Sequence, residues 1–373
     1  MQFKPIHAAY LTAVCSVFFS CEPLVTSFDD TQDALYYESA NIQADNPVTA
    51  PAEINVMTWN IRFGAGQLPF FGDACGDRVI FTSAEIEANL QSIADKINAS
   101  NPDIVLLQEV DRQSKRSAYI DQVQWLLDNT GLNYGAYASL WKAQVIPSDG
   151  LGRMDMGNAI LSKWQLSEAE RIKLPLRGDQ DDLTQYFYLR RNILKAKIAI
   201  PMDDALYAVN IHATAFATDD TKQKHVNMYI NTLNDIHNSG AGFVTGGDLN
   251  SLPPGAGSVD FCLDDACPQD SYHTGADGGP HKDGSYFNNF SGEPDILQPL
   301  YDSYTPAVSL SRYTADDSKY FTHAPSTSNL TADRKLDYLF TNLVWEAHSD
   351  STHQDASDLS DHLPVTAILK VAP

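Results

Sequence analysis

The feature that most constrains the fold of this chain is an alternation of short β-rich runs with helical patterns. A capping box formed by Thr82 and Glu85 opens a helix predicted over 82–98, whose apolar residues follow at spacings of four, three and four. Pro102 ends this pattern, and residues 104–107 form a continuous apolar run that suits a strand buried on both faces. The alternation predicts an α/β fold with a buried sheet.

Other segments extend this pattern over most of the chain. A second helix is predicted over 219–237, and a stretch rich in Gly, Asp, Pro and Asn, from about 251 to 318, predicts long surface loops. With 43% hydrophobic residues, the chain has enough apolar material for a sizeable core. The remaining predicted strands are 54–59, 158–162, 193–200, 206–211, 243–245, 336–340 and 365–369.

The N-terminus has the order of a secretory signal, which predicts that residues 1–21 direct export. Lys4 is followed by a mostly apolar run over 8–19, which is too short for an ordinary transmembrane helix, and then by Ser20 and Cys21. Residues 17–21 resemble a bacterial lipobox, although Phe18 stands where Leu is usual. We therefore expect an exported protein, secreted or held at the cell surface or outer membrane by a lipid on Cys21.

The segment that follows is acidic. Residues 22–53 contain seven Asp or Glu, no Lys or Arg, and no sustained periodicity, which predicts a solvated tether. Beyond it, residues 54–373 keep 24 basic and 41 acidic residues, a net charge of −17. That charge disfavours a protein that binds long nucleic acid through a basic groove.

Three of the five cysteines, Cys75, Cys262 and Cys267, would remain beyond the lipidated one after cleavage before Cys21. The close pair Cys262 and Cys267 suits a loop-closing disulfide in an oxidising compartment. Two free thiols or ligands for a soft metal are the alternatives, and a pair alone is a weak zinc signal.

Polar side chains of one kind gather where the predicted strands end. Carboxylates, amides and imidazoles placed together can bind a hard divalent cation and can position and deprotonate a water molecule. Each residue alone has an ordinary structural explanation, such as a turn Asp or a half-buried His, so the argument depends on their co-occurrence. The residues are Asn60, Gln108, Glu109, His212, Asp248, Asn250, Asp337, Asp361 and His362.

The motifs around these residues, taken in order, resemble the endonuclease/exonuclease/phosphatase superfamily. That superfamily includes DNase-I-like nucleases, abasic-site endonucleases, sphingomyelinases and inositol polyphosphate phosphatases. The resemblance implies a four-layer fold of two packed mixed β-sheets flanked by helices over 54–373, with the site at one edge. It runs from about residue 55 to 369 and rests on Thr-Trp-Asn-Ile-Arg (58–62), Leu-Gln-Glu-Val (107–110), Gly-Asn-Ala-Ile-Leu-Ser (157–162), Val-Asn-Ile-His (209–212), Gly-Asp-Leu-Asn (247–250), Leu-Asp-Tyr (336–338) and Ser-Asp-His-Leu-Pro-Val (360–365).

The same resemblance implies a metal site. Glu109, helped by Asn60 and Asp361, would hold Mg²⁺, or Mn²⁺ or Ca²⁺, against a phosphoryl oxygen, where the cation stabilises charge in the transition state. Oxygen ligands suit Mg²⁺ better than zinc.

It also implies catalytic roles. Asp248 and Asn250 would orient the attacking water and a phosphate oxygen, and His212 would donate to the phosphoryl group or protonate the leaving oxygen. His362 would act as general base or charge stabiliser, with Asp337 fixing its tautomer. Asp248 and His362 both stay candidates for the base. A His at position 212 is typical of the DNase-I-like, sphingomyelinase-like and inositol-phosphatase-like members, which disfavours the abasic-site branch and DNA repair.

Basic residues are candidates for phosphate recognition because arginine makes bidentate contacts with phosphate. The basic candidates are Arg190, Arg191, Arg153 and Lys335.

One feature departs from the DNase-I-like pattern, in which a second acid before the strand at 158 orients the His that matches His212. Asp149 and Asp155 are the acids available, and neither aligns securely.

Three functions from different classes fit these observations. The favoured one is a metal-dependent phosphodiesterase or phosphatase that acts on a phospholipid headgroup or an organic phosphate. The second is an extracellular DNase-I-like nuclease, which the net charge of −17 disfavours. The third is a catalytically silent surface binding protein, which the intact set of catalytic positions disfavours. We expect a monomer.

Overall fold

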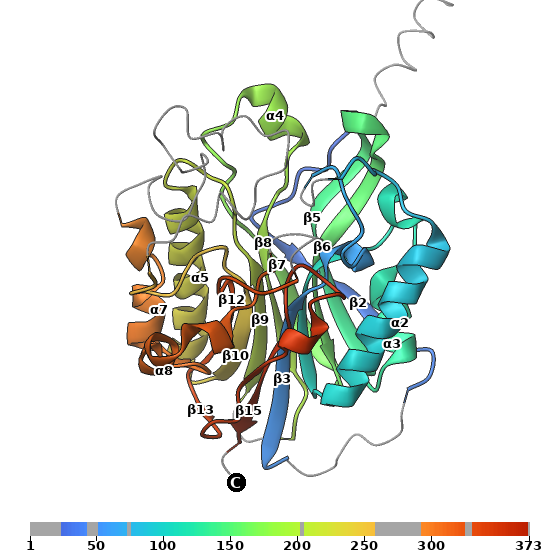
Figure 1. Cartoon of the computed structure of the whole chain (residues 1–373). Coiled ribbons are helices and arrows are strands. Elements are labelled where there is room, and N and C mark those ends of the chain that lie inside the picture. Colours follow the sequence, from blue (N-terminus) through green and yellow to red (C-terminus); the bar gives the residue numbers. More distant parts are fainter. Residues whose placement is uncertain are drawn as a thin grey trace, which may run out of the picture.

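The computed structural model describes residues 24–42, 51–72, 76–201, 205–257, 292–324 and 330–371. Within these residues two mixed β-sheets pack against each other (Figure 1). The order in the first sheet is β1 (Thr31–Asp33), β7 (Leu166–Lys173), β8 (Asn192–Ile198), β9 (Leu206–His212), β10 (Gly242–Asp248), β12 (Asp337–Thr341) and β11 (Thr305–Pro306). The order in the second is β13 (Val344–Trp345), β15 (Val365–Lys370), β3 (Glu53–Asn60), β4 (Ile104–Asp111), β6 (Gly152–Ser162), β5 (Tyr134–Ile146) and β2 (Leu35–Glu38), with β14 (Ser351–Thr352) paired to β15.

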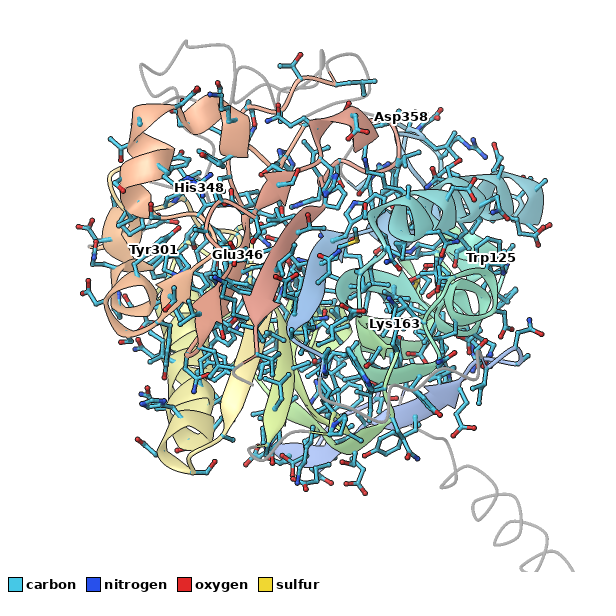
Figure 2. All side chains as sticks on the ribbon, turned by 90° about the horizontal axis from the view of Figure 1, so that it is seen from below. Trp125, Lys163, Tyr301, Glu346, His348 and Asp358 are labelled. Atoms are coloured by element: carbon cyan, nitrogen blue, oxygen red, sulfur yellow. The ribbon has the colours of Figure 1, made fainter. Side chains whose placement is uncertain are left out.

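Helices cover the outer face of each sheet. Helices α2 (Ser83–Ser100) and α3 (Gln122–Asn129) lie on the second sheet, and α5 (Thr221–Asn238) and α7 (Gln298–Ser303) lie on the first (Figure 1). Viewed from below, Trp125 of α3 and Tyr301 of α7 mark the two outer layers, with both sheets between them (Figure 2). The short helices α4 (Asp182–Phe187) and α8 (Leu310–Ala315) complete the described set. The predicted four-layer α/β fold is therefore confirmed.

Three groups of buried side chains fill the spaces between these layers. One lies between the sheets and includes Val56, Leu106 and Leu194. The others lie under α2 and α3 and under α5, where the apolar stripe of each helix meets its sheet. The strand predicted at 104–107 is buried on both faces because one face meets the other sheet and the opposite face meets the helices.

The predicted helix at 82–98 is confirmed with its capping box. Thr82 accepts from the Glu85 backbone N–H, and the Glu85 carboxylate accepts from the Thr82 backbone N–H. The helix predicted over 219–237 is α5. Each predicted strand also corresponds to a strand of the structure, with boundaries shifted by a few residues.

Two predictions about irregular segments differ from the structure. The segment predicted as a tether, 22–53, contains strands β1 and β2, which pair with β7 and β5 at the sheet edges. Their side chains are mostly exposed, so they show no hydrophobic alternation and gave no sequence signal. The loop prediction over 251–318 is wrong for α7 and α8, which are too short for helical periodicity to stand out, and residues 258–291 of this stretch lie outside the described residues. The signal segment, Cys21 and the other four cysteines lie outside the described residues.

Acid should weaken the fold through His225, which is buried on α5. Its Nδ1 accepts from the Thr214 N–H at 3.2 Å, and its Nε2 lies 2.8 Å from the Pro175 carbonyl oxygen. Burial lowers the pKa of His225 to about 4. As the pH falls, the unfolded chain takes up a proton on His225 at a higher pH than the folded chain does. The contribution of neutral His225 to the free energy of unfolding is therefore complete above about pH 6.5 and disappears as the pH falls towards 4. We expect a loss of about 2 kcal/mol between pH 7 and pH 5.

Urea unfolding at pH 7 and pH 5 measures this loss in wild type, His225→Gln and His237→Gln. His237 is an exposed histidine on the same helix and serves as the matched control. His225→Gln should lose less stability on acidification than wild type, and His237→Gln should lose as much. An undiminished loss in His225→Gln would assign the acid sensitivity to other groups.

Candidate active site

The centre of the site is set by two glycines at the end of β10. A Cβ atom at Gly247 would lie 1.9 Å from the Ile211 carbonyl oxygen, and one at Gly246 would lie 2.2 Å from that of Tyr338. Only glycine allows β10 to run this close to both neighbouring strands. The next residue, Asp248, is thereby placed in register with His212 of β9 on one side and with Asp337 of β12 on the other.

The buried carboxylate of Asp248 joins the two sheets. Its Oδ2 lies 3.2 Å from His212 Nε2 and accepts from Asn60 Nδ2 at 3.2 Å. His362 Nε2 is 3.7 Å from the same oxygen, and the Asn250 backbone N–H donates to Oδ1 at 2.9 Å. Because Asn60 and His362 flank the second sheet whereas His212 belongs to the first, this carboxylate receives contacts from both.

His362 is held between two carboxylates. Its Nδ1 lies 2.8 Å from Asp337 Oδ2, and its Nε2 faces Asp248. The backbone beside it is fixed, because Trp59 Nε1 donates to the His362 carbonyl oxygen and the Ser360 hydroxyl donates to that of Asn60. Both ring nitrogens therefore face acceptors, which favours the imidazolium form.

Glu109 reaches the site because β4 is irregular. The pairing of β4 with β6 shifts register between Leu107 and Val110, and Glu109 between them has a φ of 55°. A bulge of this kind redirects a side chain at the end of a strand. Glu109 Oε1 accepts from Asn60 Nδ2 at 3.3 Å and lies 4.0 Å from His212 Nε2.

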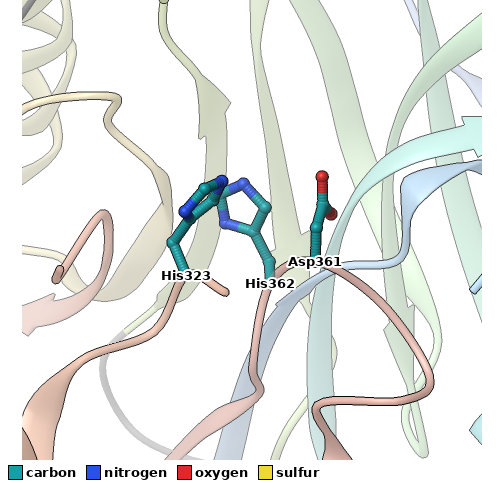
Figure 3. Close-up of side chains that lie close together, drawn as sticks. All are labelled: His323, Asp361 and His362. Atoms are coloured by element: carbon teal, nitrogen blue, oxygen red, sulfur yellow. The ribbon is translucent and has the colours of Figure 1, made fainter. Parts of the chain in front are cut away.

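Asp361 and His323 also lie next to His362. The three side chains extend from their loops in the same direction (Figure 3). The His323 and His362 rings meet edge to face with centroids 5.0 Å apart, and Asp361 Oδ1 accepts from the Ser360 hydroxyl. The sequence did not indicate His323, because it lies in no motif at a strand end. A backbone bridge between the two residues brings it next to His362.

The environments of the two catalytic histidines differ. Burial and the charge of Arg191 lower the pKa of His212, which stays neutral at pH 7. Burial alone would lower the pKa of His362 as well, but the charges of Asp337 and Asp248 raise it well above its usual value. Burial raises the pKa of Asp337, whereas the two histidines hold the pKa of Asp248 below its usual value against the effect of burial.

The donor set of the site fits a divalent cation. Two groups of three have ligand atoms within 4.8 Å of one another. Glu109 adds a half-buried carboxylate, 23% exposed, next to them, and carboxylate oxygens are ligands for hard cations. Asn60 differs from its expected role, because its amide nitrogen faces Glu109 and Asp248 while its oxygen accepts from the Arg62 N–H. The two groups are Asp248 with Asp337 and His362, and Asp361 with His323 and His362. An imidazolium has no lone pair for a metal, so the carboxylates are the ligands that these groups offer while His362 is protonated.

Of the basic residues considered for substrate recognition, Arg191 lies at the site. It is buried, and its Nη1 donates to the His212 carbonyl oxygen at 3.3 Å. Arg190 donates to the carbonyls of Tyr188 and Tyr186 and lies away from the carboxylates. Arg153 is exposed and donates to Gln113, and the buried Lys335 donates to the Asp337 carbonyl oxygen.

Neither acid considered as a partner for His212 takes that place. Asp155 accepts from the hydroxyls of Tyr137 and Ser139, and the exposed Asp149 lies in a turn after β5. His212 Nδ1 has no hydrogen-bond partner among the described residues. A polar pair behind the site, Gln108 donating to Asn210 at 2.7 Å, instead ties β4 to β9.

The sequence matches the model of the Endonuclease/Exonuclease/phosphatase family over residues 57–362. The chain belongs to this family. Its members are generally metal-dependent hydrolases of phosphoester bonds, so the predicted superfamily is confirmed. No curated protein sequence matches the chain.

Solved structures agree on the fold. An endonuclease/exonuclease/phosphatase of Beutenbergia cavernae is 17% identical with a TM-score of 0.55, over 86% of this chain and 72% of that one. A family protein of Leptotrichia buccalis is 13% identical with a TM-score of 0.52, over 85% and 100% of the two chains. A conserved protein of unknown function from Enterococcus faecalis is 13% identical with a TM-score of 0.50, over 84% and 98%. At these identities the likeness shows the fold alone.

A bilayer-spanning helix is not found in the part of the chain that the structure describes.

The state of His362 can be observed directly. In chelator, its ring should remain an imidazolium at pH 7.5, where an ordinary histidine is neutral, because two carboxylates face it. NMR titration of the ring nitrogens measures this, and Asp337→Asn should lower the pKa of His362. Asp333→Asn, an acid four residues earlier that contacts His323, is the control and should leave it unchanged. A neutral His362 at pH 7.5 in wild type would contradict the assignment.

Proposed function

We propose that this protein is a divalent-metal-dependent hydrolase that cleaves a phosphoester bond of a phospholipid headgroup or another organic phosphate. The observation that carries the proposal is the convergence on Asp248 of His212 from one sheet and of Asn60 and His362 from the other. Membership of the family supports the reaction class. The geometry around Asp248 supports the assignment of roles.

Glu109 and Asp361 are the carboxylates that would hold the cation, which we take to be Mg²⁺. When bound, it neutralises charge on the phosphoryl oxygens as the ester is cleaved. Asn60 would orient Glu109 and Asp248 through its amide nitrogen. This set of metal ligands is smaller than the set expected from the sequence, because Asn60 becomes a positioning residue.

The remaining residues would act on the water and the phosphoryl group. Asp248, fixed by the Asn250 N–H, accepts a proton from the attacking water, whose oxygen bonds to phosphorus as the ester bond breaks. The imidazolium of His362, held by Asp337, donates to a phosphoryl oxygen. His212 donates from Nε2 to Asp248 and fixes the orientation of this carboxylate, and the proton released by water ends on the leaving oxygen.

The choice of substrate follows from charge. Residues 54–373 carry −17, and a long polyanion gains its affinity by releasing counterions from a basic groove. A single phosphate needs only local compensation, which Arg191 and a cation supply. Small esters and lipid headgroups therefore fit better than DNA.

The purified full chain should hydrolyse members of a substrate panel in Mg²⁺ and stop in chelator. The panel holds sphingomyelin, phosphoinositides, bis(p-nitrophenyl) phosphate and plasmid DNA. Asp248→Asn should lower turnover by about 10²- to 10⁴-fold, because it removes the base. Glu109→Gln should raise the Mg²⁺ concentration needed for half-maximal rate.

Glu168→Gln is the matched control for Glu109→Gln. Glu168 also lies at a register shift of its strand with a positive φ, 48°, but contacts Lys197 and Tyr207 away from the site. An unchanged Mg²⁺ titration in Glu109→Gln would remove that residue as a ligand. Preferential cleavage of DNA would make the protein a nuclease, and silence across the panel would favour a binding protein.

We also propose that the chain is exported and lipidated on Cys21. The support is the order of charged, apolar and small residues before Cys21. Expressed in a bacterium with labelled palmitate, the wild-type protein should take up label in the membrane fraction, and Cys21→Ser should not. The matched control Cys15→Ser should label normally, and label retained in Cys21→Ser would overturn the assignment.

A further inference from the structure

A small cavity opens where the C-terminal end of β7 meets the N-terminal described segment. Its volume is about 140 Å³. Three basic side chains from β7 and the segment before β8 contribute to its wall. An aromatic ring, that of Phe28, comes from the N-terminal segment. The lining residues are Ser27, Phe28, Arg171, Lys173, Leu176 and Arg190.

The charge of this wall is unusual for the chain. Three of the six lining residues are cationic and none carries a carboxylate, although acidic residues outnumber basic ones by 48 to 25 overall. Lys173 contacts Asp30, with Nζ 3.1 Å from Oδ1, but that carboxylate is 96% exposed and is therefore largely screened by water. The cavity thus keeps a positive potential.

Arg171 supplies most of the uncompensated charge. It is buried, with Nε donating to the Ser139 carbonyl oxygen and Nη2 to that of Arg190, and Phe28 lies over its guanidinium at 3.9 Å. Its Nη1 is buried and has no hydrogen-bond partner among the described residues. Burial, and then the charge of Arg190, lower the pKa of Arg171, as expected for a cation that lacks a counterion. An anion in the cavity would compensate it.

The cavity and the candidate active site lie at the same end of the strands of the first sheet. Lys173 of β7 pairs with Asn192 of β8, and the next residue of β8 pairs with Ile211, which precedes His212. Two strand spacings separate these positions, roughly 10 Å. Arg190 at the cavity and Arg191 at the site are consecutive residues.

We propose that this cavity binds a second phosphate group of the substrate, while the carboxylate-rich centre acts on the first. The inference rests on the proposed function and narrows it to organic phosphates that carry a second phosphate roughly 10 to 15 Å from the scissile one, two strand spacings to His212 and three to Asp248. Lys173 is the donor that can reach such a group, because its side chain is 42% exposed. The buried Arg171 contributes positive charge to the wall of the cavity.

Binding is tested first without catalysis. Inorganic phosphate is titrated into the full chain, and binding is followed by calorimetry. Chelator is present because, without a bound cation, the carboxylates of the catalytic centre repel phosphate. Lys173→Gln should weaken binding about tenfold, and Asp30→Asn should strengthen it by freeing the Lys173 amine. Lys197→Gln is the matched control, since Lys197 also contacts an acid at 3.1 Å but lies at the opposite end of β8. It should bind as wild type does.

The second measurement tests the link to the substrate. A linear eight-carbon diol bisphosphate and the matching alkyl monophosphate are compared as inhibitors of bis(p-nitrophenyl) phosphate hydrolysis in Mg²⁺. The bisphosphate should inhibit wild type and Lys197→Gln about tenfold more tightly than the monophosphate, and Lys173→Gln should lose the difference.

The two measurements fail in distinguishable ways. Phosphate binding that Lys173→Gln does not weaken would overturn the anion site, whatever the enzyme hydrolyses. Phosphate binding that depends on Lys173, together with equal inhibition by the two esters, would overturn the role in substrate binding. Absence of hydrolysis in every substrate would overturn the proposed function but would leave the titration in chelator as a valid test of the cavity.

Discussion

The site depends on a carboxylate that is buried between two sheets. A charged group removed from water is stable only when donors or opposite charges surround it, and Asp248 obtains these from both sheets. Asn60 reaches it from the end of β3, His212 from the end of β9, and His362 from the loop before β15. The two sheets must therefore meet in one register. The glycines at 246 and 247 place Asp248 at this point, since a Cβ at either would collide with a neighbouring strand of the same sheet.

The same constraint separates the two histidines. His212 lies next to one carboxylate and near Arg191, and burial leaves it neutral. His362 lies between two carboxylates, Asp337 and Asp248, and remains charged. One neutral and one charged imidazole beside a single base give the centre distinct donors for the base and for the phosphoryl group. Charge is also divided along the sheet edge, with acids at the catalytic centre and cations at the cavity beside β7.

Much of the fold was predictable because its central elements have strong local patterns. Helix α2 has a complete capping box and a regular apolar stripe, and β4 is apolar throughout its first four residues. The edge strands β1 and β2 were not predictable. They are held by backbone pairing to β7 and β5 with their side chains mostly exposed, and backbone pairing leaves no mark on residue type. Helices α7 and α8 are too short for a period to show.

The sequence by itself determined the family, the strand ends that carry polar side chains, and the chemical types gathered there. These are local properties, carried by motifs of three to six residues. Only the tertiary structure decided that Asn60 faces the carboxylates through its nitrogen, that Arg191 rather than Arg190 lies beside His212, and that His323 packs on His362. These contacts depend on the register between sheets and on a bulge at Glu109, which are set by packing among segments far apart in the chain and have no local sequence signal.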